Sequence, residues 1–237
     1  MTKKSLDFEL KVVDGLKILL PNSNIIHTGN NSQTSDINLI YNGYSTFIEA
    51  KISGGQFGCP RLKYIDNTWK GVTENPISNS VSYILNNDPH AYSFMEYAKT
   101  LYQYKQYKHI MPSYSVFQQE PDEYFNYNSL SDIIKNVGNQ YIYKSRENTQ
   151  LLNIIVEYYT LKKVDYIQIS DNFYQINKNN LTDIPNITAD VELTVRLVNR
   201  RTKKWFEVIP TLKLKNMVES NFSILLNTKK LNPFKNI

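Results

Sequence analysis

The sequence predicts an α/β fold of the α+β kind, in which helices flank a mixed central sheet and extra β-hairpins follow towards the C-terminus. Three observations predict it. Residues 5–20 carry apolar side chains at helical spacing, and residues 34–51 have the composition and the turn of a β-hairpin. From Val164 onward, apolar and polar residues alternate, which is typical of half-buried strands.

The first predicted element is a helix over residues 5–20. Ser5 can cap its N-terminus, and Pro21 ends it. Its apolar stripe consists of Leu6, Val13, Leu16 and Leu20. Glu9 falls on this stripe, where an acid is unusual. It is either a glutamate at the stripe's edge that reaches water or part of a site.

The hairpin of residues 34–51 follows a short predicted strand over Asn24–Thr28. Its turn is Asn42-Gly43, the strongest short hairpin signal, because a type I′ turn needs positive φ at both central residues. The flanking runs are rich in Ile, Leu, Tyr, Phe and Thr, which suit strands.

A two-residue turn fixes the register of this hairpin. Tyr41 faces Tyr44, and counting back along both strands brings Asp36 opposite Glu49. Lys51 shares their face because side chains alternate along a strand. Directly opposed Cβ atoms lie about 4.5–5.5 Å apart, and like charges so placed repel. The pair therefore predicts a bound cation such as Mg²⁺, with the Lys51 ammonium alongside to orient a water or neutralise a phosphate.

The residues Ser35-Asp36 and Glu49-Ala50-Lys51 resemble the PD-(D/E)XK nuclease superfamily, with Ser35 where the superfamily's name has proline. The resemblance implies a restriction-endonuclease-like core. It also implies that Asp36 and Glu49 are metal ligands, that the Ala50 carbonyl is a third ligand, and that Lys51 is the catalytic cation. The alternative is an ordinary exposed hairpin whose polar face happens to hold these residues.

Three further residues are candidates for the same site. Members of the superfamily often carry a glutamate on the helix before the hairpin, which favours Glu9 as a third acid. Ser53 and Gln56 follow the hairpin in a glycine-rich stretch that allows close approach of the backbone to a ligand. Either can contact phosphate or a water of the site, and Gln56 is the better candidate.

Basic residues form a second set of candidates, for contacts with double-stranded DNA. Arg61 and Lys63 come soon after the hairpin. The densest positive charge lies in the connection after a predicted strand and consists of Arg200, Arg201, Lys203 and Lys204, and Arg196 of that strand is a further candidate. A strand ribbon can enter the major groove, where arginine commonly reads guanine. The alternative is a solvated turn.

The remaining elements follow the same signals. Residues 60–87 are expected to be loops with a short element at Val81–Leu85. The other expected elements are helices at 88–108, 130–137 and 149–162, a hairpin of Val164–Ile169 with Phe173–Ile176, and a hairpin of Val191–Leu197 with Trp205–Leu214. Pro210 argues that its strand is an edge strand or bulges there. The tail from Lys229 is expected to be loose.

The composition sets broad limits. The 237 residues fit one domain, 1–237, with a catalytic core at 5–60 and a DNA-recognition elaboration at 61–237. The net charge of +5 modestly favours a polyanionic partner. Cys59 is the one cysteine, so an intramolecular disulfide is excluded and a reducing cytoplasm is expected. No apolar run approaches the roughly 20 residues that span a bilayer, so no membrane association is expected.

The resemblance to the nuclease superfamily implies a Mg²⁺-dependent deoxyribonuclease that hydrolyses DNA phosphodiesters. The size and layout of the chain look like those of a type II restriction endonuclease, and a palindromic site would imply a homodimer. Two alternatives stay open. One is a phage or mobile-element nuclease that recognises DNA structure. The other is a non-catalytic DNA-binding module.

Overall fold

The computed structural model describes residues 3–29, 34–57, 62–65, 68–71, 76–87, 143–144, 149–177, 181, 183–200 and 205–235. The chain forms two compact units. The first contains Met1–Gly55, Val156–Asp190 and Leu214–Ile237, and the second contains Gln56–Ile155 and Val191–Lys213. The first unit is thus built from three stretches that lie far apart in the sequence.

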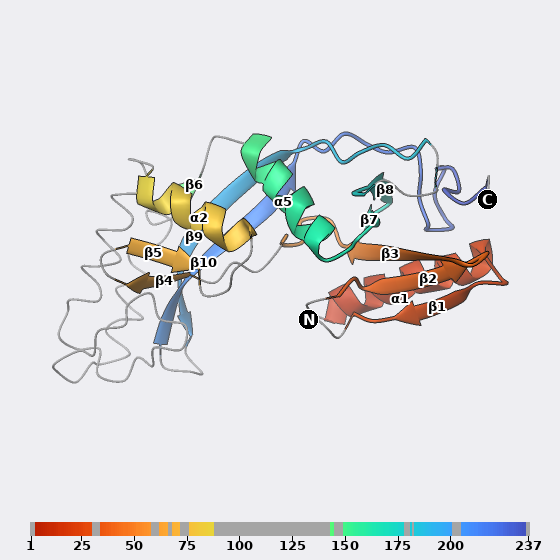
Figure 1. The fold of residues 1–237 in the computed structure, drawn as a ribbon, viewed down its shortest axis with the longest axis horizontal. Coiled ribbons are helices and arrows are strands. Elements are labelled where there is room, and N and C mark those ends of the chain that lie inside the picture. Colours follow the sequence, from red (N-terminus) through yellow and green to blue (C-terminus); the bar gives the residue numbers. More distant parts are fainter. Residues whose placement is uncertain are drawn as a thin grey trace. The chain divides into compact units, whose positions relative to one another are not determined.

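A mixed five-stranded sheet is the centre of the first unit (Figure 1). Its strands are β1 (Asn24–His27), β2 (Ile37–Tyr41), β3 (Tyr44–Lys51), β7 (Tyr166–Ile169) and β8 (Asn172–Gln175), in that spatial order. All neighbours are antiparallel except β3 and β7, which are parallel. The mixed sheet predicted from the sequence is therefore confirmed.

The β2–β3 hairpin has the predicted turn and register. Asn42 and Gly43 have φ of 49° and 81°, as a type I′ turn requires. Tyr41 pairs with Tyr44, and the ladder runs on to Ile37 opposite Ile48. One further step brings Asp36, just before β2, to the level of Glu49.

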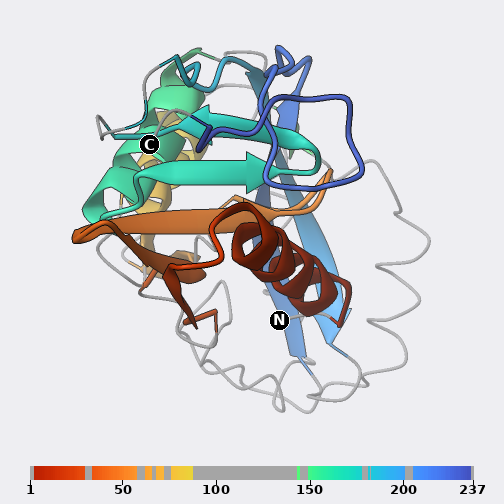
Figure 2. The same ribbon diagram turned by 90° about the vertical axis from the view of Figure 1, so that its right-hand side faces the viewer.

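Helix α1 (Lys3–Leu19) packs against one face of this sheet (Figure 2). Its stripe of Val12, Val13 and Leu16 meets Ile37 and Leu39 of β2 and Ile48 and Ala50 of β3, all buried in one core cluster. Alternation along the strands then directs Glu49 and Lys51 to the opposite face. The helix and the hairpin together decide on which side of the sheet the polar residues lie.

The C-terminal segment is ordered on the same face as α1, which corrects the expectation of a loose tail. Phe234 is buried against Phe173 of β8, with ring centroids 6.0 Å apart, and Leu231 forms a bridge with Phe222. The Gln168 side chain of β7 accepts from the Ile224 N–H and donates to Ser223. These contacts join residues far apart in the sequence, so the composition of the tail alone does not predict them.

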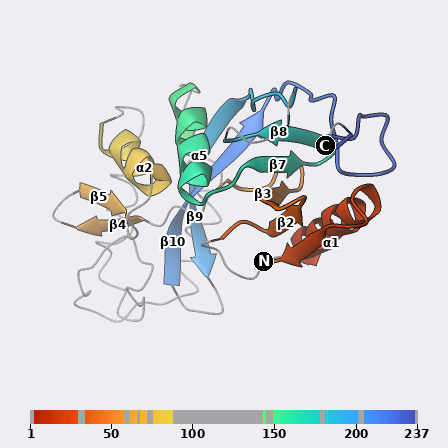
Figure 3. The same ribbon diagram turned by 45° about the vertical axis from the view of Figure 1, so that its right-hand side comes forward.

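Helix α5 (Thr149–Leu161) precedes β7 and confirms the helix expected at 149–162. Two residues after the helix, Lys163 has a left-handed φ of 59°, and the Val164 N–H donates to the Tyr159 carbonyl. Such a C-terminal cap reverses the chain directly after the helix. The end of α5 therefore lies close to the start of β7 (Figure 3), and Lys162 directly follows the helix.

The predicted β7–β8 hairpin is also present, with a turn of Ser170 and Asp171 and with Ile169 paired to Asn172. Ser170 takes the positive φ, at 51°. β7 is shorter than the predicted Val164–Ile169, and β8 has the predicted length but begins one residue before the predicted Phe173–Ile176.

The second unit contains two small sheets. Strands β4 (Leu62–Ile65) and β5 (Thr68–Gly71) pair antiparallel, and helix α2 (Pro76–Asn87) follows. This corrects the expectation of loops at 60–87. The Asn86 side chain bonds both the N–H and the carbonyl of Trp69, a contact across the sequence that links α2 to β5.

Strands β6 (Tyr143–Lys144), β9 (Asp190–Arg200) and β10 (Trp205–Lys215) form the other sheet, in the order β10-β9-β6. β9 and β10 are hydrogen-bonded neighbours, as predicted, and β10, which carries Pro210, is an edge of the described sheet. The helices expected at 88–108 and 130–137 lie outside the described residues. None of the helices in the described ranges has the length and apolar character needed to cross a membrane.

Candidate active site

Two carboxylates and an ammonium group meet on the face of the sheet opposite α1. The Lys51 Nζ lies 2.5 Å from Glu49 Oε1 and 3.9 Å from Asp36 Oδ2. Glu49 and Asp36 are buried, at 2% and 8% exposure. The three predicted residues are thus brought together, and all belong to the first unit.

Asp36 lies where β2 has not yet begun but β3 continues. The Ala50 N–H therefore donates to the Asp36 side chain, with Oδ2 at 2.9 Å, and no strand carbonyl of β2 is opposite it. Burial and then the charge of Glu49 raise the pKa of Asp36 to about 6, against the opposing effects of Lys51 and of the Ala50 N–H. The raised value indicates that the two carboxylates repel each other in a partly desolvated place.

Lys51 stays charged in this setting. Burial lowers its pKa, but interactions with Tyr159, Glu49 and Asp36 together raise it well above its usual value. Burial also raises the pKa of Tyr159, so this phenol is neutral near pH 7. The two carboxylates are therefore the groups that hold the positive charge on Lys51 at neutral pH.

A second lysine, which was not predicted from the sequence, also reaches the site. The Lys162 Nζ lies 3.2 Å from Glu49 Oε2, and its side chain is 11% exposed. The residues are 113 positions apart. A lysine directly after a helix carries no local signal of such a role. It comes near Glu49 because the strand that follows, β7, pairs in parallel with β3.

Glu9 has a different partner. It is buried at 3% exposure, and its Oε2 lies 2.9 Å from Nε2 of His27 on β1. His27 pairs with Ile37, so this pair is on the α1 face of the sheet. Glu9 contributes the weakest of the effects that raise the pKa of Asp36. Its role as a third acid stays a prediction.

The glycine-rich stretch forms a turn directly after β3. The Gly55 N–H donates to the Ile52 carbonyl, and Gly54 supplies the positive φ of 70°. Ser53 is exposed on this turn. Gln56 belongs to the second unit, and its amide donates to Thr211 Oγ1 at 3.0 Å. That bond gives Gln56 a structural partner, and its predicted contact with phosphate or water stays a prediction.

The predicted DNA-contacting residues are described only in part. Lys63 is in β4, and Arg196 and Arg200 are in β9. Arg61, Arg201, Lys203 and Lys204 lie outside the described residues. Their roles stay predictions.

The donor set suits a hard divalent cation. Mg²⁺ is usually held by one or two carboxylates and completed by water and substrate phosphate. Asp36 and Glu49 are two such carboxylates, and their mutual repulsion, seen in the raised pKa of Asp36, would be relieved by a cation. Across the described ranges no group of three or more His, Cys, Asp or Glu side chains gathers to hold a metal. Two carboxylates alone would leave most coordination positions of such an ion to water or to other ligands.

No family model matches the sequence, and no curated protein matches it. The chain is similar to a structure described as HhaI endonuclease in complex with DNA, at 15% sequence identity and a TM-score of 0.42, over 91% of this chain and 92% of that chain.

Proposed function

We propose that this protein is a divalent-metal-dependent endodeoxyribonuclease. The observation that carries the proposal is the buried group of Asp36, Lys51 and Glu49, in which an ammonium bridges two carboxylates from adjoining segments of one hairpin. Taking charges out of water costs free energy that an ordinary surface hairpin avoids by leaving them solvated, and clusters of largely buried charged groups are typical of functional sites. This favours the nuclease over the alternative of an ordinary polar hairpin.

Each residue has a distinct role in the proposal. The Asp36 and Glu49 carboxylates hold the ion, with the Ala50 carbonyl as a third ligand. The Lys51 ammonium donates hydrogen bonds to the attacking water or to a phosphate oxygen, and its charge offsets the negative charge that grows on the phosphate in the transition state. Its high pKa suits this electrostatic role and makes Lys51 a poor general base near pH 7.

The reaction is the hydrolysis of one phosphodiester. A water oxygen forms a bond to phosphorus and gives up one proton to solvent, the ester bond to one sugar oxygen breaks, and that oxygen takes up a proton from solvent as it leaves. Mg²⁺, when bound, would lower the pKa of the attacking water and stabilise the negative charge that develops on the phosphate. Lys51 and the two carboxylates fix the geometry around the reacting atoms.

Double-stranded DNA is the proposed substrate, and a site-specific cut by a homodimer is the proposed mode. The net charge of +5 supports binding to a polyanion, and the basic residues around 196–204 are the proposed contacts. Phosphate contacts would supply most of the affinity and base-edge contacts the specificity. A two-fold dimer matches a palindromic site.

The test is incubation with plasmid and phage DNA, with Mg²⁺ and with EDTA. We expect discrete fragments only with Mg²⁺, and none from Lys51→Ala. Lys17→Ala is the matched control, since it removes the same charge from an exposed side chain on α1 and is expected to cut normally. Glu9→Gln in the same assay tests the third acid, and unchanged cutting would return Glu9 to a structural role.

Other outcomes separate the alternatives. DNA that is bound in a gel but intact after long incubation would favour the non-catalytic module. Cutting of branched or nicked DNA, with intact plasmids and phage genomes, would favour a structure-specific nuclease.

A further inference from the structure

We propose that Lys162 is a positioning residue for the Glu49 carboxylate, and that the two lysines at Glu49 have different tasks. Lys162 is the fixed anchor, and Lys51 is the cation that must yield its position. The inference rests on the proposed function and adds a residue that the catalytic motif does not contain. It starts from the finding that each oxygen of Glu49 has its own ammonium partner.

The charges at the site balance without a metal ion. Asp36 and Glu49 contribute two negative charges, and Lys51 and Lys162 contribute two positive ones, with all four side chains largely buried. A divalent cation added to this neutral set leaves an excess of positive charge, which is costly where burial reduces solvation. One ammonium group must therefore move away when a divalent ion is held.

The geometry indicates which ammonium moves. Lys51 lies between the carboxylates, within 2.5 Å of Glu49 and 3.9 Å of Asp36, which is the place that an ion shared by both would take. Lys162 Nζ contacts the other oxygen of Glu49, Oε2, at 3.2 Å. Displacement of Lys51 frees Oε1 while Lys162 keeps the carboxylate in its orientation.

Lys162 is also held firmly. Its Nζ lies 5.7 Å from the ring centroid of Tyr158 and 5.4 Å from that of Tyr159, within the range of cation–π attraction. The Lys162 N–H donates to the Tyr158 carbonyl at the end of α5. A lysine fixed by two rings and a helix end suits an anchor, and groups that orient a metal ligand typically change metal affinity by 10–100-fold.

The test measures Mn²⁺ binding by calorimetry on the full-length protein without DNA, beside cleavage with Mg²⁺. We expect Lys162→Met to weaken Mn²⁺ binding by about 10–100-fold, and Lys162→Arg to restore much of it. Lys51→Met should not weaken Mn²⁺ binding, because its side chain competes for the same place, although it abolishes cleavage. The opposite behaviour of the two lysines is the signature of the proposal.

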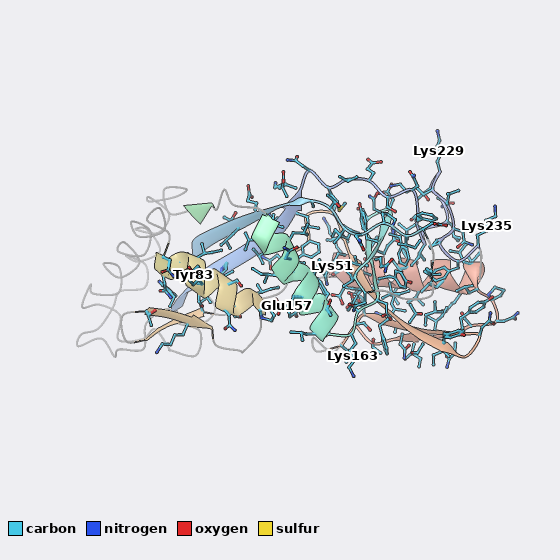
Figure 4. All side chains as sticks on the ribbon, turned by 45° about the horizontal axis from the view of Figure 1, so that its top comes forward. Lys51, Tyr83, Glu157, Lys163, Lys229 and Lys235 are labelled. Carbon is cyan, nitrogen blue, oxygen red and sulfur yellow. The ribbon has the colours of Figure 1, made fainter. Side chains whose placement is uncertain are left out.

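Lys163→Met is the matched control. Lys163 is the adjacent lysine, is exposed and projects away from the ribbon, whereas Lys51 lies among other side chains (Figure 4). Both Lys and Met carry a Cβ, so the left-handed φ of 59° is no harder to adopt in this variant. We expect wild-type Mn²⁺ affinity.

The results distinguish two kinds of failure. Equal Mn²⁺ affinity in the wild type and in a folded Lys162→Met would overturn the anchor while leaving the nuclease intact. Tighter binding in both Lys162→Met and Lys51→Met would show that both lysines merely repel the ion, and would also overturn it. A wild type that neither binds Mn²⁺ nor cuts DNA would reject the proposed function itself, and the anchor with it.

Discussion

At the scale of single residues, the Asp36 side chain takes the place of a strand carbonyl. Its carboxylate accepts the Ala50 N–H at the point where β2 has not yet begun, so one side chain both completes the ladder and faces Glu49. The ionised form of Asp36 is disfavoured there, because burial and the charge of Glu49 raise its pKa to about 6. A carboxylate that is buried beside another carboxylate should lower the stability of the folded protein where it is ionised.

This cost has a definite pH dependence. The pKa of Asp36 is about 6 in the folded protein and 3.8 in the reference state. Between these values the unfolded chain has lost the proton that the folded chain keeps, so the free energy of unfolding falls as pH rises from 4 to 6, by up to about 3 kcal/mol. We expect Asp36→Asn, in EDTA, to lack this fall and to be more stable than the wild type at pH 7.

Urea denaturation from pH 4 to pH 7.5 measures the difference, with Asp14→Asn as the control because the Asp14 side chain is 71% exposed. Parallel curves for the wild type and Asp36→Asn would contradict the raised pKa. Added Mg²⁺ should recover stability in the wild type and not in Asp36→Asn, because only the wild type keeps both carboxylates.

At the scale of elements, the sequence was informative where structure is local. The Asn42-Gly43 turn determines the register of β2 and β3, and this register brings Asp36 and Glu49 together. The parallel pairing of β3 with β7 has no such local signal, and the arrival of Lys162 depends on it. The same reason explains the error at 60–87, where a side-chain bond between Asn86 and Trp69 links α2 to β5.

The packing of α1 against the C-terminal segment is an element-scale contact that can be tested. A Cβ built on Gly15 would lie 2.5 Å from the Ile224 carbonyl oxygen, a backbone atom that cannot rotate away. We expect Gly15→Ala to lower the free energy of unfolding by about 1–3 kcal/mol, because the helix and the segment must separate. The gain in helix propensity from Gly to Ala, about 1 kcal/mol, works in the opposite direction.

Lys11→Ala is the control on the exposed face of α1, and we expect a change within about 0.5 kcal/mol. Chemical denaturation measures the free energy of unfolding of the wild type, Gly15→Ala and Lys11→Ala. A Gly15→Ala protein more stable than the wild type would mean that the segment yields without cost, and that α1 does not depend on its close approach.

At the scale of the whole molecule, the residues proposed for the chemistry and most of the net positive charge belong to different units. Asp36, Glu49, Lys51 and Lys162 all lie in the first unit. Residues 191–213, which belong to the second unit, contain six Lys and Arg against two Asp and Glu, so they account for most of the net charge of +5. This separation predicts that DNA binding and DNA cutting can be removed independently.

The last prediction tests that independence. Replacing Arg200, Arg201, Lys203 and Lys204 by alanine should weaken DNA binding and flatten its dependence on salt, because each lost phosphate contact reduces the slope of log affinity against log salt by about 0.9. Mn²⁺ binding without DNA should not change, since the carboxylates and both lysines of the site are intact. Lys51→Ala should lose cleavage but keep the wild-type dependence of DNA binding on salt. A salt slope unaltered by the fourfold replacement would make that connection a solvated turn, and binding would then have to come from basic residues elsewhere in the chain.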